Sequence, residues 1–416
     1  MRNRRAWGWA LLAVGAGFLF GLWAGCAPPR DPRHLVIWHQ MRVDERLILE
    51  EQLRQFMAEN PGVRVEQIYK ETEELRSGFI IAAIAGQGPD LVYGPSDQVG
   101  PFEVMGIIRP LEDLFSPAYL ASFTPAGLTW YRGHLYQMAD KLGNHLTLIY
   151  NKDMLRRPPE TDEDLIAEGM RLTSDTDGDG KTDVYGLCWN YTEPFFFIPF
   201  MTGFGGWVMT EEGVPTLESR GTVDGLRFIR DLRDRFKIIP GEADYNIADM
   251  LFKDGKSAMI INGDWSWAGY RKAGINIGVA PLPRITSTGL WCAPMVSPKG
   301  YSLNANVPAE KTELVVRLLE FLMRPEIQLS TARALSTMPT RREALQSEYV
   351  QNDETLRNSA RQIEQGRPMP VVPELRAIWD AMRPAYQAVL GGAMTPEEAA
   401  RAMQQLALRK IRELNE

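Results

Sequence analysis

Apolar positions follow two alternating spacings from residue 34 onward. Residues 34–38, 63–69 and 90–93 show the short apolar runs or the two-residue alternation that predict strands. Between them, residues 44–60 and 73–85 carry apolar side chains three and four positions apart, which is typical of helices with one buried face. Strands and helices that alternate in this way predict a parallel sheet with helices on its faces.

The second half of the chain continues the alternation and then becomes mostly helical. It is predicted to contain strands at 145–150, 257–261 and 275–280 and helices at 162–173, 222–236, 310–323, 373–390 and 396–414. A helical tail cannot form an α/β domain of its own, and 416 residues are too many for one hydrophobic core. We therefore expect two α/β lobes that the tail completes, with the chain crossing between them more than once.

The N-terminus has the layout of an export signal. Three arginines among the first five residues precede an uncharged, largely apolar run over residues 6–25. The run and the next residue end in the letters LWAGC, which resemble a bacterial lipobox with Trp23 in the place of the usual aliphatic residue. We predict a signal segment over 1–25, lipidation of Cys26 and a proline-rich tether over 26–33. The alternatives are an uncleaved membrane anchor and ordinary cleavage, and all three place the body of the protein outside the cytoplasm.

Charge and motifs argue against several classes of function. The net charge of −7 disfavours a nucleic-acid partner, because phosphate backbones require a basic face. The chain has no G-x-S-x-G, Walker or H-E-x-x-H motif, and its four histidines lack zinc spacing. Apart from Cys26, the cysteines are Cys188 and Cys292, and the sequence leaves open whether they form a disulfide or remain two buried thiols.

One acidic loop has the spacing of a calcium site. Its aspartates fall at positions one, three, five and nine of a calcium-binding loop, and they are Asp175, Asp177, Asp179 and Asp183. Gly180 takes the sixth position, where the turn needs glycine, but Gly186 stands at the twelfth in place of the usual glutamate. Aligned carboxylates without a cation repel each other, so we predict a structural Ca²⁺ site rather than a plain polar turn.

Aromatic side chains often stand beside polar residues and turns. The chain has 11 Trp, 13 Tyr and 16 Phe, and several lie at predicted strand ends, such as Tyr93 near Asp97. Sugars bind flat aromatic rings flanked by Asp, Glu, Asn or Arg, which form hydrogen bonds with the hydroxyl groups. Tyr93 is therefore a candidate sugar contact.

Two tryptophans follow the predicted turn at residues 262–264. Residues two positions apart on a helix do not share a face. We therefore expect Trp265 to point into a cleft and Trp267 to pack inside its lobe. Asp264 is predicted either to cap a short helix that runs through residue 270 or to accept a hydrogen bond from a sugar hydroxyl group beside Trp265.

Six segments, taken in order, resemble the maltose/maltodextrin-binding proteins, which are extracytoplasmic solute-binding proteins of sugar ABC transporters. The segments are LVIW (35–38), GPDLVYGPSDQVG (88–100), LTLIYNKDML (146–155), TEPFFF (192–197), DYNIADMLFKDGKSAMIINGDWSWAG (244–269) and MPVVPELRAIWDAMRPAY (369–386). The resemblance implies an α/β fold of two lobes, each a mostly parallel sheet flanked by helices, with a ligand cleft between them. The first lobe would comprise 34–142 and 295–347, and the second 143–294 and 348–416.

The resemblance also implies a set of sugar-binding residues. Asp97 and Glu193 match acids in the family's cleft that bind hydroxyl groups, and Phe195 takes the place of a stacking tyrosine. The match further covers Tyr245, Trp265 and Trp379 as sugar-contacting aromatic residues and Met369 as a lesser apolar contact.

Besides Phe195, and Asp264 in place of a Pro, four positions depart from the family pattern. Gly94 stands where a Trp is expected, Gln98 where an Arg is expected, and Asn144 where a Glu is expected. Arg42 lies where the family has an Asp-Lys pair. Gln98, Asn144 and Arg42 stay candidate contacts, and we expect Gly94 to leave space for a differently shaped ring. A maltodextrin-like α-glucoside, a cyclodextrin or another oligosaccharide would fit.

The implied function is a non-catalytic receptor of an ABC importer. It would bind an oligosaccharide between the lobes, close, and deliver it to the membrane permease subunits. The alternatives are a receptor of the same fold for a non-sugar solute or for chemosensory signalling, and an extracytoplasmic glycoside hydrolase. We expect a monomer on a lipid anchor that requires no cofactor, apart from the Ca²⁺ predicted for the acidic loop.

Overall fold

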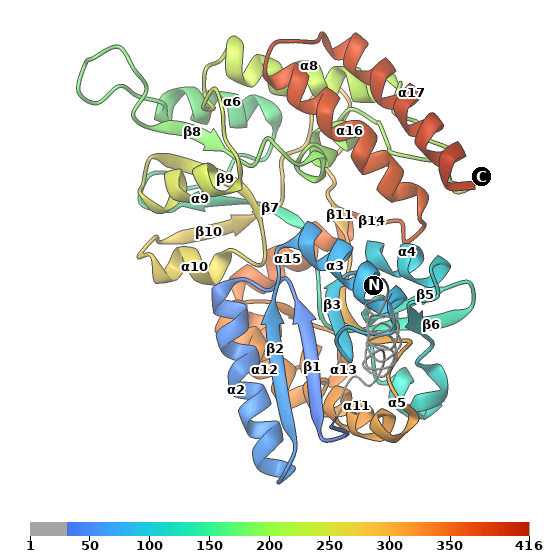
Figure 1. Ribbon diagram of the computed structural model, residues 1–416. Coiled ribbons are helices and arrows are strands. Elements are labelled where there is room, and N and C mark those ends of the chain that lie inside the picture. The colour runs from blue at the N-terminus through green and yellow to red at the C-terminus, as the bar shows by residue number, and fades with distance from the viewer. Residues whose placement is uncertain (1–30, 416) are drawn as a thin grey trace, which may run out of the picture.

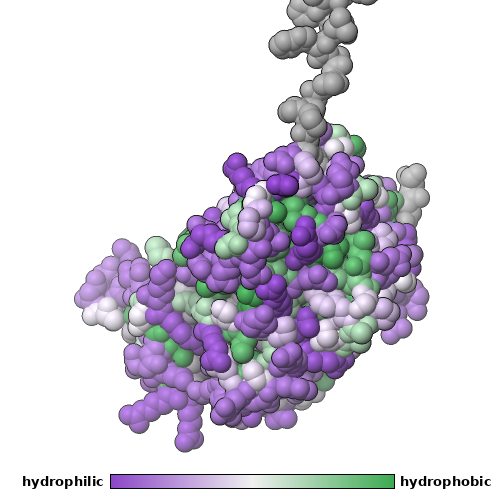
Figure 2. Space-filling model, turned by 90° about the horizontal axis from the view of Figure 1, so that it is seen from below, coloured by the Kyte–Doolittle hydropathy of each residue, from purple (hydrophilic) through white to green (hydrophobic). Residues whose placement is uncertain are grey.

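The computed structural model describes residues 31–415, so the predicted signal segment and Cys26 lie outside the described residues. Figure 1 shows two lobes, one above the other, with the chain passing between them. In the part of the chain that the structure describes, no helix is both long and apolar enough to cross a membrane. The surface seen from below, shown in Figure 2, is mostly hydrophilic, with apolar patches between polar side chains.

The first lobe, the lower one in Figure 1, is built on an eight-stranded sheet. The strand order is β13-β6-β12-β3-β1-β2, with β4 paired to β12 and β5 paired to β6. The strands are β1 (His34–His39), β2 (Arg64–Tyr69), β3 (Leu91–Pro95), β4 (Ile108–Arg109), β5 (Leu128–Tyr131), β6 (His134–Leu142), β12 (Lys299–Asn304) and β13 (Met338–Pro339). The helices are α2 (Val43–Glu59), α3 (Thr72–Ile84), α4 (Val99–Val104), α5 (Pro117–Ala121), α11 (Ala309–Leu322), α12 (Pro325–Leu335), α13 (Arg342–Leu345) and α14 (Glu348–Asn352).

The second lobe is built on a smaller, four-stranded sheet in the order β10-β7-β9-β8. Its strands are β7 (Leu146–Asn151), β8 (Tyr185–Cys188), β9 (Ser257–Gly263) and β10 (Ile277–Ala280). Its helices are α6 (Asp162–Leu172), α7 (Ile198–Gly203), α8 (Arg220–Asp234), α9 (Tyr245–Lys253), α10 (Trp267–Lys272), α16 (Glu374–Leu390) and α17 (Pro396–Asn415). The Trp189 indole donates to Tyr386 Oη at 3.1 Å, which ties α16 to the core of this lobe. Cys188 and Cys292 are free, buried thiols, so they do not form the disulfide that the sequence left open.

Both sheets are mixed, so the expectation of mostly parallel sheets is wrong. In the first lobe β1 runs parallel to β2 and β3, but β12 is antiparallel to β3, β4 and β6. In the second lobe β7 is antiparallel to β9 and β10, and β8 is parallel to β9. The reason is the path of the chain. Strand β12 enters the first sheet after the chain has returned from the second lobe, and it therefore runs against the strand beside it.

Within residues 31–415, three crossing segments connect the lobes, in agreement with the prediction that the chain crosses more than once. The first links β6 to β7, and the second contains β11 (Met295–Val296). The third leads from α15 (Glu354–Gln365) through β14 (Arg367–Pro368) to α16. Strands β11 and β14 pair in parallel, and Ser297 N donates to Gly143 O at 2.9 Å, so the three segments lie side by side. Val350 of α14 packs with Met338 of β13, so α14 lies with the first lobe, beyond the boundary expected at residue 347. The other lobe boundaries given above remain a prediction.

The helices and strands predicted from periodicity are all present, with ends shifted by one or two residues. Helix α8 begins at Arg220, before its apolar pattern starts, because Ser219 Oγ caps it by accepting from Thr222 N at 3.1 Å. Thr161 and Asp164 form a capping box that fixes the start of α6. Local capping and amphipathic patterning therefore agree, which is why these elements were predictable.

Candidate ligand-binding cleft

A cavity of about 430 Å³ lies between the two lobes. Gln40 and Arg42 reach it from the segment after β1, and Asp97 from the segment after β3. The carboxyl ends of parallel strands are where ligands bind in α/β folds. Nine of the predicted contact residues line the cavity: Arg42, Asp97, Asn144, Glu193, Phe195, Tyr245, Trp265, Met369 and Trp379.

The second lobe lines the cavity with aromatic rings. Trp265 follows β9, Trp379 lies on α16, and Phe195 lies in the short 3₁₀ turn Pro194–Phe196. The ring centre of Phe195 lies 6.4 Å from that of Trp265 and 6.5 Å from that of Trp379. Trp265 Nε1 donates to Tyr245 Oη at 3.1 Å. These contacts fix the orientation of the rings, as stacking on a sugar face requires.

The first lobe lines the cavity with charged and amide side chains. Asp97 Oδ2 lies 3.5 Å from Arg76 Nη2, whereas Asp97 Oδ1 is buried and has no hydrogen-bond partner among the described residues. Gln40 Oε1 is in the same situation within that part of the chain. Burial raises the pKa of Asp97, although the Arg76 guanidinium opposes the rise. Buried acceptors without donors are unfavourable.

A buried ion pair forms part of this wall. Glu45 on α2 pairs with Lys141 on β6, and both side chains are almost fully buried. Burial would raise the pKa of Glu45, but the ammonium groups of Lys141 and Lys299 lower it to about 2. Burial would lower the pKa of Lys141, but Glu45 raises it above its ordinary value. Both groups are therefore charged at neutral pH, and each depends on the other.

Two cations of the first lobe lie against aromatic rings of the second. The guanidinium carbon of Arg42 lies 4.2 Å from the centre of the Tyr245 ring. Lys299 Nζ lies 4.6 Å from the centre of the nearest Trp265 ring. Cations at such distances are attracted by the electron-rich ring faces. These two contacts join the lobes across the cavity, so the structure represents a closed arrangement.

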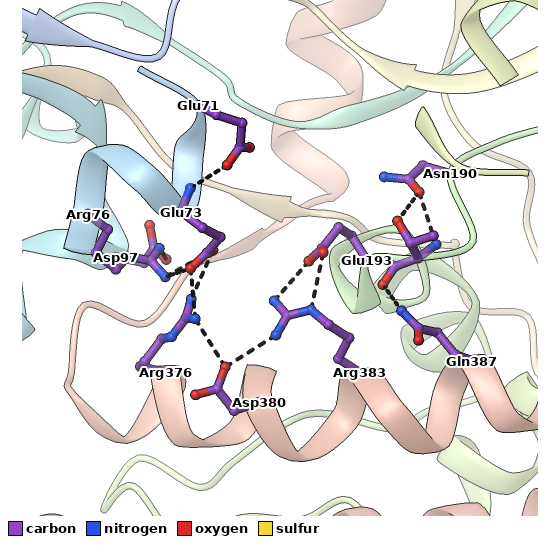
Figure 3. A network of polar contacts seen from close by, with 11 residues as sticks. Glu71, Glu73, Arg76, Asp97, Asn190, Glu193, Arg376, Asp380, Arg383 and Gln387 are labelled. Carbon is purple, nitrogen blue, oxygen red and sulfur yellow. Dashed lines mark hydrogen bonds and ion pairs between the residues drawn. The ribbon is translucent and has the colours of Figure 1, made fainter. Parts of the chain in front are cut away.

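Glu193 is held by an arginine of α16, as Figure 3 shows. Arg383 Nε and Nη2 donate to the two carboxylate oxygens of Glu193 at 3.1 and 3.0 Å. Arg383 follows Trp379 by one helical turn, so both side chains face the cavity. Such a fork-to-fork pair fixes the direction of the carboxylate.

Tyr93 and Gln98 do not line the cavity, contrary to prediction. Tyr93 is buried in the first lobe, where its hydroxyl donates to Asp140 Oδ1 at 2.9 Å. Gln98 is buried as well, and a Cβ added to Gly94 would meet Gln98 Oε1 at 2.5 Å. The expectation that Gly94 leaves space for a ligand ring is therefore wrong, because the Gln98 side chain fills that space. We no longer place Tyr93 or Gln98 against the ligand.

The turn after β9 separates the two tryptophans as predicted. Trp265 lines the cavity, and Trp267 is fully buried within the second lobe. The prediction that Asp264 caps the next helix is wrong, since α10 begins at Trp267 and Ser266 holds the cap position. Asp264 is instead buried, and its Oδ1 has no hydrogen-bond partner in the described part of the chain. Burial raises its pKa, and Lys299 opposes the rise.

Sequence reasoning missed several charged residues that line the cavity. They are Glu45, Glu71, Glu73, Arg76, Asp244, Lys299, Arg376 and Arg383. For Arg376 and Arg383 a signal existed, because they lie three residues before and four residues after Trp379 on one helix. For Lys299 there was none, because only the pairing of β12 with β3 and β6 brings it to the cleft.

The acidic loop projects from the edge of the second lobe, between α6 and β8 (Figure 1). Carboxylate oxygens of Asp175, Asp177 and Asp183 lie within 4.8 Å of one another, and Asp179 is not part of this group. The backbone amides of Gly180 and Gly178 donate to Asp175 and lower the pKa of its carboxyl. The arrangement suits a hard cation, which carboxylate oxygens bind, and Ca²⁺ at this loop stays a prediction.

The sequence is similar to known binding proteins over most of its length. Residues 51–358 match the family model of the bacterial extracellular solute-binding proteins. The chain is 26% identical to the maltotriose-binding protein of Pyrococcus abyssi over 362 residues, which cover 86% of this chain and 77% of that protein. It is 25% identical to the maltodextrin-binding protein of Bacillus subtilis over 388 residues, which cover 89% of each.

Two solved structures share the fold. The maltose/maltodextrin-binding domain of Bdellovibrio bacteriovorus, bound to maltotriose, has a TM-score of 0.88 and 47% identity. The maltotriose-binding protein of Thermus thermophilus, also bound to maltotriose, has a TM-score of 0.81 and 26% identity. Both matches cover 91% of this chain and all of the other chain. They confirm the two-lobed α/β fold, and the family model confirms a location outside the cytoplasm. The chain therefore belongs to the bacterial extracellular solute-binding proteins, in the group of the maltose/maltodextrin-binding proteins.

Proposed function

We propose that this protein is the receptor of an ABC importer and binds a short α-glucan, such as maltotriose, between its lobes. The observation that carries the proposal is the composition of the cavity. Its second-lobe wall carries aromatic rings, and its first-lobe wall carries charged and amide side chains such as Asp97 and Gln40. The ligands of the relatives support the same choice, since both structural relatives contain maltotriose.

The charges of the cavity favour an uncharged ligand. Among the described residues, five basic and six acidic side chains line it, so neither sign is in clear excess. Most of them already have partners, such as Arg383 with Glu193 and Glu45 with Lys141. A charged ligand would have to break these pairs or remain unpaired in a partly buried site, and either is costly. An uncharged sugar can bind without breaking these ion pairs.

Gln40 and Asp97 indicate the kind of hydrogen bond that the ligand supplies, since both side chains line the cavity. An amide oxygen and a carboxylate accept hydrogen bonds. Sugar hydroxyl groups donate such bonds, whereas an apolar solute does not. Stacking of the pyranose rings on Trp265 and Trp379 would bury the apolar faces of the same ligand. Binding in the open form followed by closure would then bring both walls onto the sugar.

The role does not include catalysis in our proposal. Both carboxylate oxygens of Glu193 already accept hydrogen bonds from Arg383, so this side chain is not placed as a general acid for a bound ligand. We further propose that the protein acts as a monomer and that Cys26 carries a lipid that holds it near the permease. The lipobox-like segment before Cys26 supports this anchor, and one group of relatives is described as lipoproteins.

A calorimetric titration with maltotriose tests the proposal, and a thermal-shift screen of sugars extends it. Maltotriose at a hundredfold its Kd should add about 2.7 kcal/mol to the free energy of unfolding. We expect larger shifts with maltotriose or longer α-glucans than with galactosides. If no α-glucan or cyclodextrin shifts the unfolding transition but a non-sugar solute does, the protein is a receptor for a non-sugar solute. Shorter products from labelled α-glucans would instead indicate a glycoside hydrolase.

A further inference from the structure

One ion pair joins the lobes directly across the mouth of the cleft. Glu73 lies in the first turn of α3 in the first lobe, and Arg376 lies in the first turn of α16 in the second. Arg376 Nη1 donates to Glu73 Oε1 at 3.0 Å, and Arg376 Nη2 lies 2.8 Å from Glu73 Oε2. Figure 3 shows the two side chains meeting between the helices. A guanidinium that meets both oxygens of a carboxylate is the strongest common geometry for such a pair.

The pair is the middle of a longer chain of alternating charges. On the first lobe, Glu73 contacts Arg76 at 3.3 Å, and Arg76 contacts Asp97 at 3.5 Å. On the second lobe, Arg376 contacts Asp380 at 3.1 Å. The chain then continues from Asp380 to Arg383 at 3.2 Å and from Arg383 to Glu193 at 3.0 Å. This series of ion pairs ends at Asp97 in the first lobe and at Glu193 in the second, the two cleft acids that we expect to bind sugar hydroxyl groups. It crosses from one lobe to the other between Glu73 and Arg376.

We propose that Glu73 and Arg376 form a latch that stabilises the closed form, so that the affinity for an uncharged sugar depends on ionic strength. The inference rests on the proposed sugar-binding function. The contact exists only when the lobes are together, so it shifts the equilibrium between open and closed forms toward closed. Because Glu73 and Arg376 are 49% and 29% exposed, salt can screen the pair. The Kd of a neutral ligand would otherwise be nearly independent of salt.

A second cross-lobe pair is a weaker candidate for the same role. Lys272 Nζ on α10 lies 3.3 Å from Asp44 Oδ1 on α2, through a single contact, and the lysine side chain is 69% exposed. Pairs of this kind contribute little. We therefore assign most of the salt dependence to Glu73 and Arg376.

The test is calorimetric titration of maltotriose at about 20 mM and about 500 mM NaCl, between which screening becomes strong. The variants are Glu73→Gln, Arg376→Gln and the two combined. At low salt each single variant should bind about twofold to fivefold more weakly than the wild type, and the double variant no more weakly than either. High salt should weaken the wild type to the same level and leave the variants unchanged. Exchange of the charges in Glu73→Arg with Arg376→Glu should restore part of the affinity.

A matched control is available on α2. Glu51 is 48% exposed and pairs with Arg54 within one helix, so Glu51→Gln removes a similar carboxylate that joins no lobes. It should keep the wild-type affinity and salt dependence. If Glu73→Gln behaves like Glu51→Gln, or if the double variant keeps the salt dependence of the wild type, there is no latch.

A measurement without sugar separates this proposal from the proposed function. Spin labels at Ala58→Cys on α2 and Gln405→Cys on α17, both exposed positions on opposite lobes, report the distance between the lobes. Cys188 and Cys292 are buried and should not react, and Cys26 is replaced by serine. High salt and Glu73→Gln should both deplete the short-distance population of the ligand-free protein. If the wild type fails to bind maltotriose, the proposed function is wrong. The latch is still tested in that case, because the distance distributions of the wild type and Glu73→Gln are compared without sugar. Equal distance distributions in the wild type and Glu73→Gln would overturn it.

Discussion

The two walls of the cleft differ in chemistry. Among the described residues that line the cavity, all five aromatic rings come from the second lobe: Phe195, Phe196, Tyr245, Trp265 and Trp379. The first lobe contributes no aromatic ring to this lining and presents charged and amide groups instead, such as Arg42, Asp97 and Lys299. A sugar ring can stack on the aromatic wall alone. The charged groups of the other wall form interactions only when a ligand or the opposite lobe is close to them.

This difference suggests separate roles for the lobes. The aromatic wall is held by contacts within its own lobe, such as Trp265 with Tyr245, so it is formed before closure. The polar wall contacts the other lobe through Arg42, Lys299 and Glu73. We infer that the second lobe retains the sugar in the open form and that the first lobe adds specificity and closure.

The largest effect is expected where the polar wall is most buried. Replacement Glu45→Gln leaves the buried Lys141 ammonium without its main partner. Loss of one member of a buried pair typically costs about 3–5 kcal/mol, and we expect the lower end because Asp140 also faces Lys141. Denaturant unfolding at pH 7 measures the change. Glu51→Gln on the same helix is the control and should change the free energy of unfolding by less than about 0.5 kcal/mol.

The dependence on pH sharpens this prediction. The pKa of Glu45 is lowered from 4.5 to about 2 in the folded protein, so the carboxylate binds protons more weakly when folded than when unfolded. Its contribution to stability is therefore complete above about pH 4.5 and is lost as the pH falls toward 2. The wild type should lose stability over this range more steeply than Glu45→Gln. Parallel curves for the two proteins would show that Glu45 is not held as a charged group.

The aromatic wall should determine ligand affinity. Trp265→Ala and Trp379→Ala should each weaken maltotriose binding at least tenfold, which corresponds to about 1.4 kcal/mol or more, because each removes a stacking surface. Circular dichroism should show an intact fold. Trp291→Ala provides the control, since Trp291 is 39% exposed in the second lobe and does not line the cavity. Unchanged affinity in both cavity variants would place the sugar elsewhere.

Much of the fold could be predicted from local sequence, because amphipathic helices such as α8 and α16 carry their own pattern. The direction of the strands could not. Whether β12 runs parallel or antiparallel to β3 depends on where the chain re-enters the first lobe, and no local pattern contains that information. A family resemblance implied the two lobes correctly, but the mostly parallel sheets expected within them were wrong.

Some residues of the site could also be predicted from the sequence, and others could not. Trp265 could be placed in the cleft from one turn and from the resemblance, and it lies there. The Glu45–Lys141 pair joins residues 96 positions apart, so only the folded chain reveals it. In the sequence Gly94 and Gln98 are two separate departures from the family pattern, whereas in the structure the Gln98 side chain fills the space beside Gly94.

The smallest effect on the cleft is expected from the acidic loop, which projects from the second lobe away from both walls (Figure 1). We propose that Asp175, Asp177 and Asp183 bind Ca²⁺, since their oxygens already lie together and a cation would relieve their repulsion. Added Ca²⁺ should raise the unfolding temperature, with a gain of up to about 2.7 kcal/mol at a hundredfold the Kd. The Kd for maltotriose should change less than about twofold, since binding in the closed cleft needs no movement of the loop.

The double variant Asp175→Asn with Asp177→Asn tests the loop against the cleft. It should lose the Ca²⁺-dependent rise in unfolding temperature and keep the maltotriose affinity of the wild type, because none of the loop aspartates lines the cavity. A rise that persists in the double variant would mean that Ca²⁺ binds elsewhere. A loss of sugar affinity in the same variant would mean that the loop and the cleft are coupled, and the second lobe could then no longer be regarded as an aromatic wall on an independent scaffold.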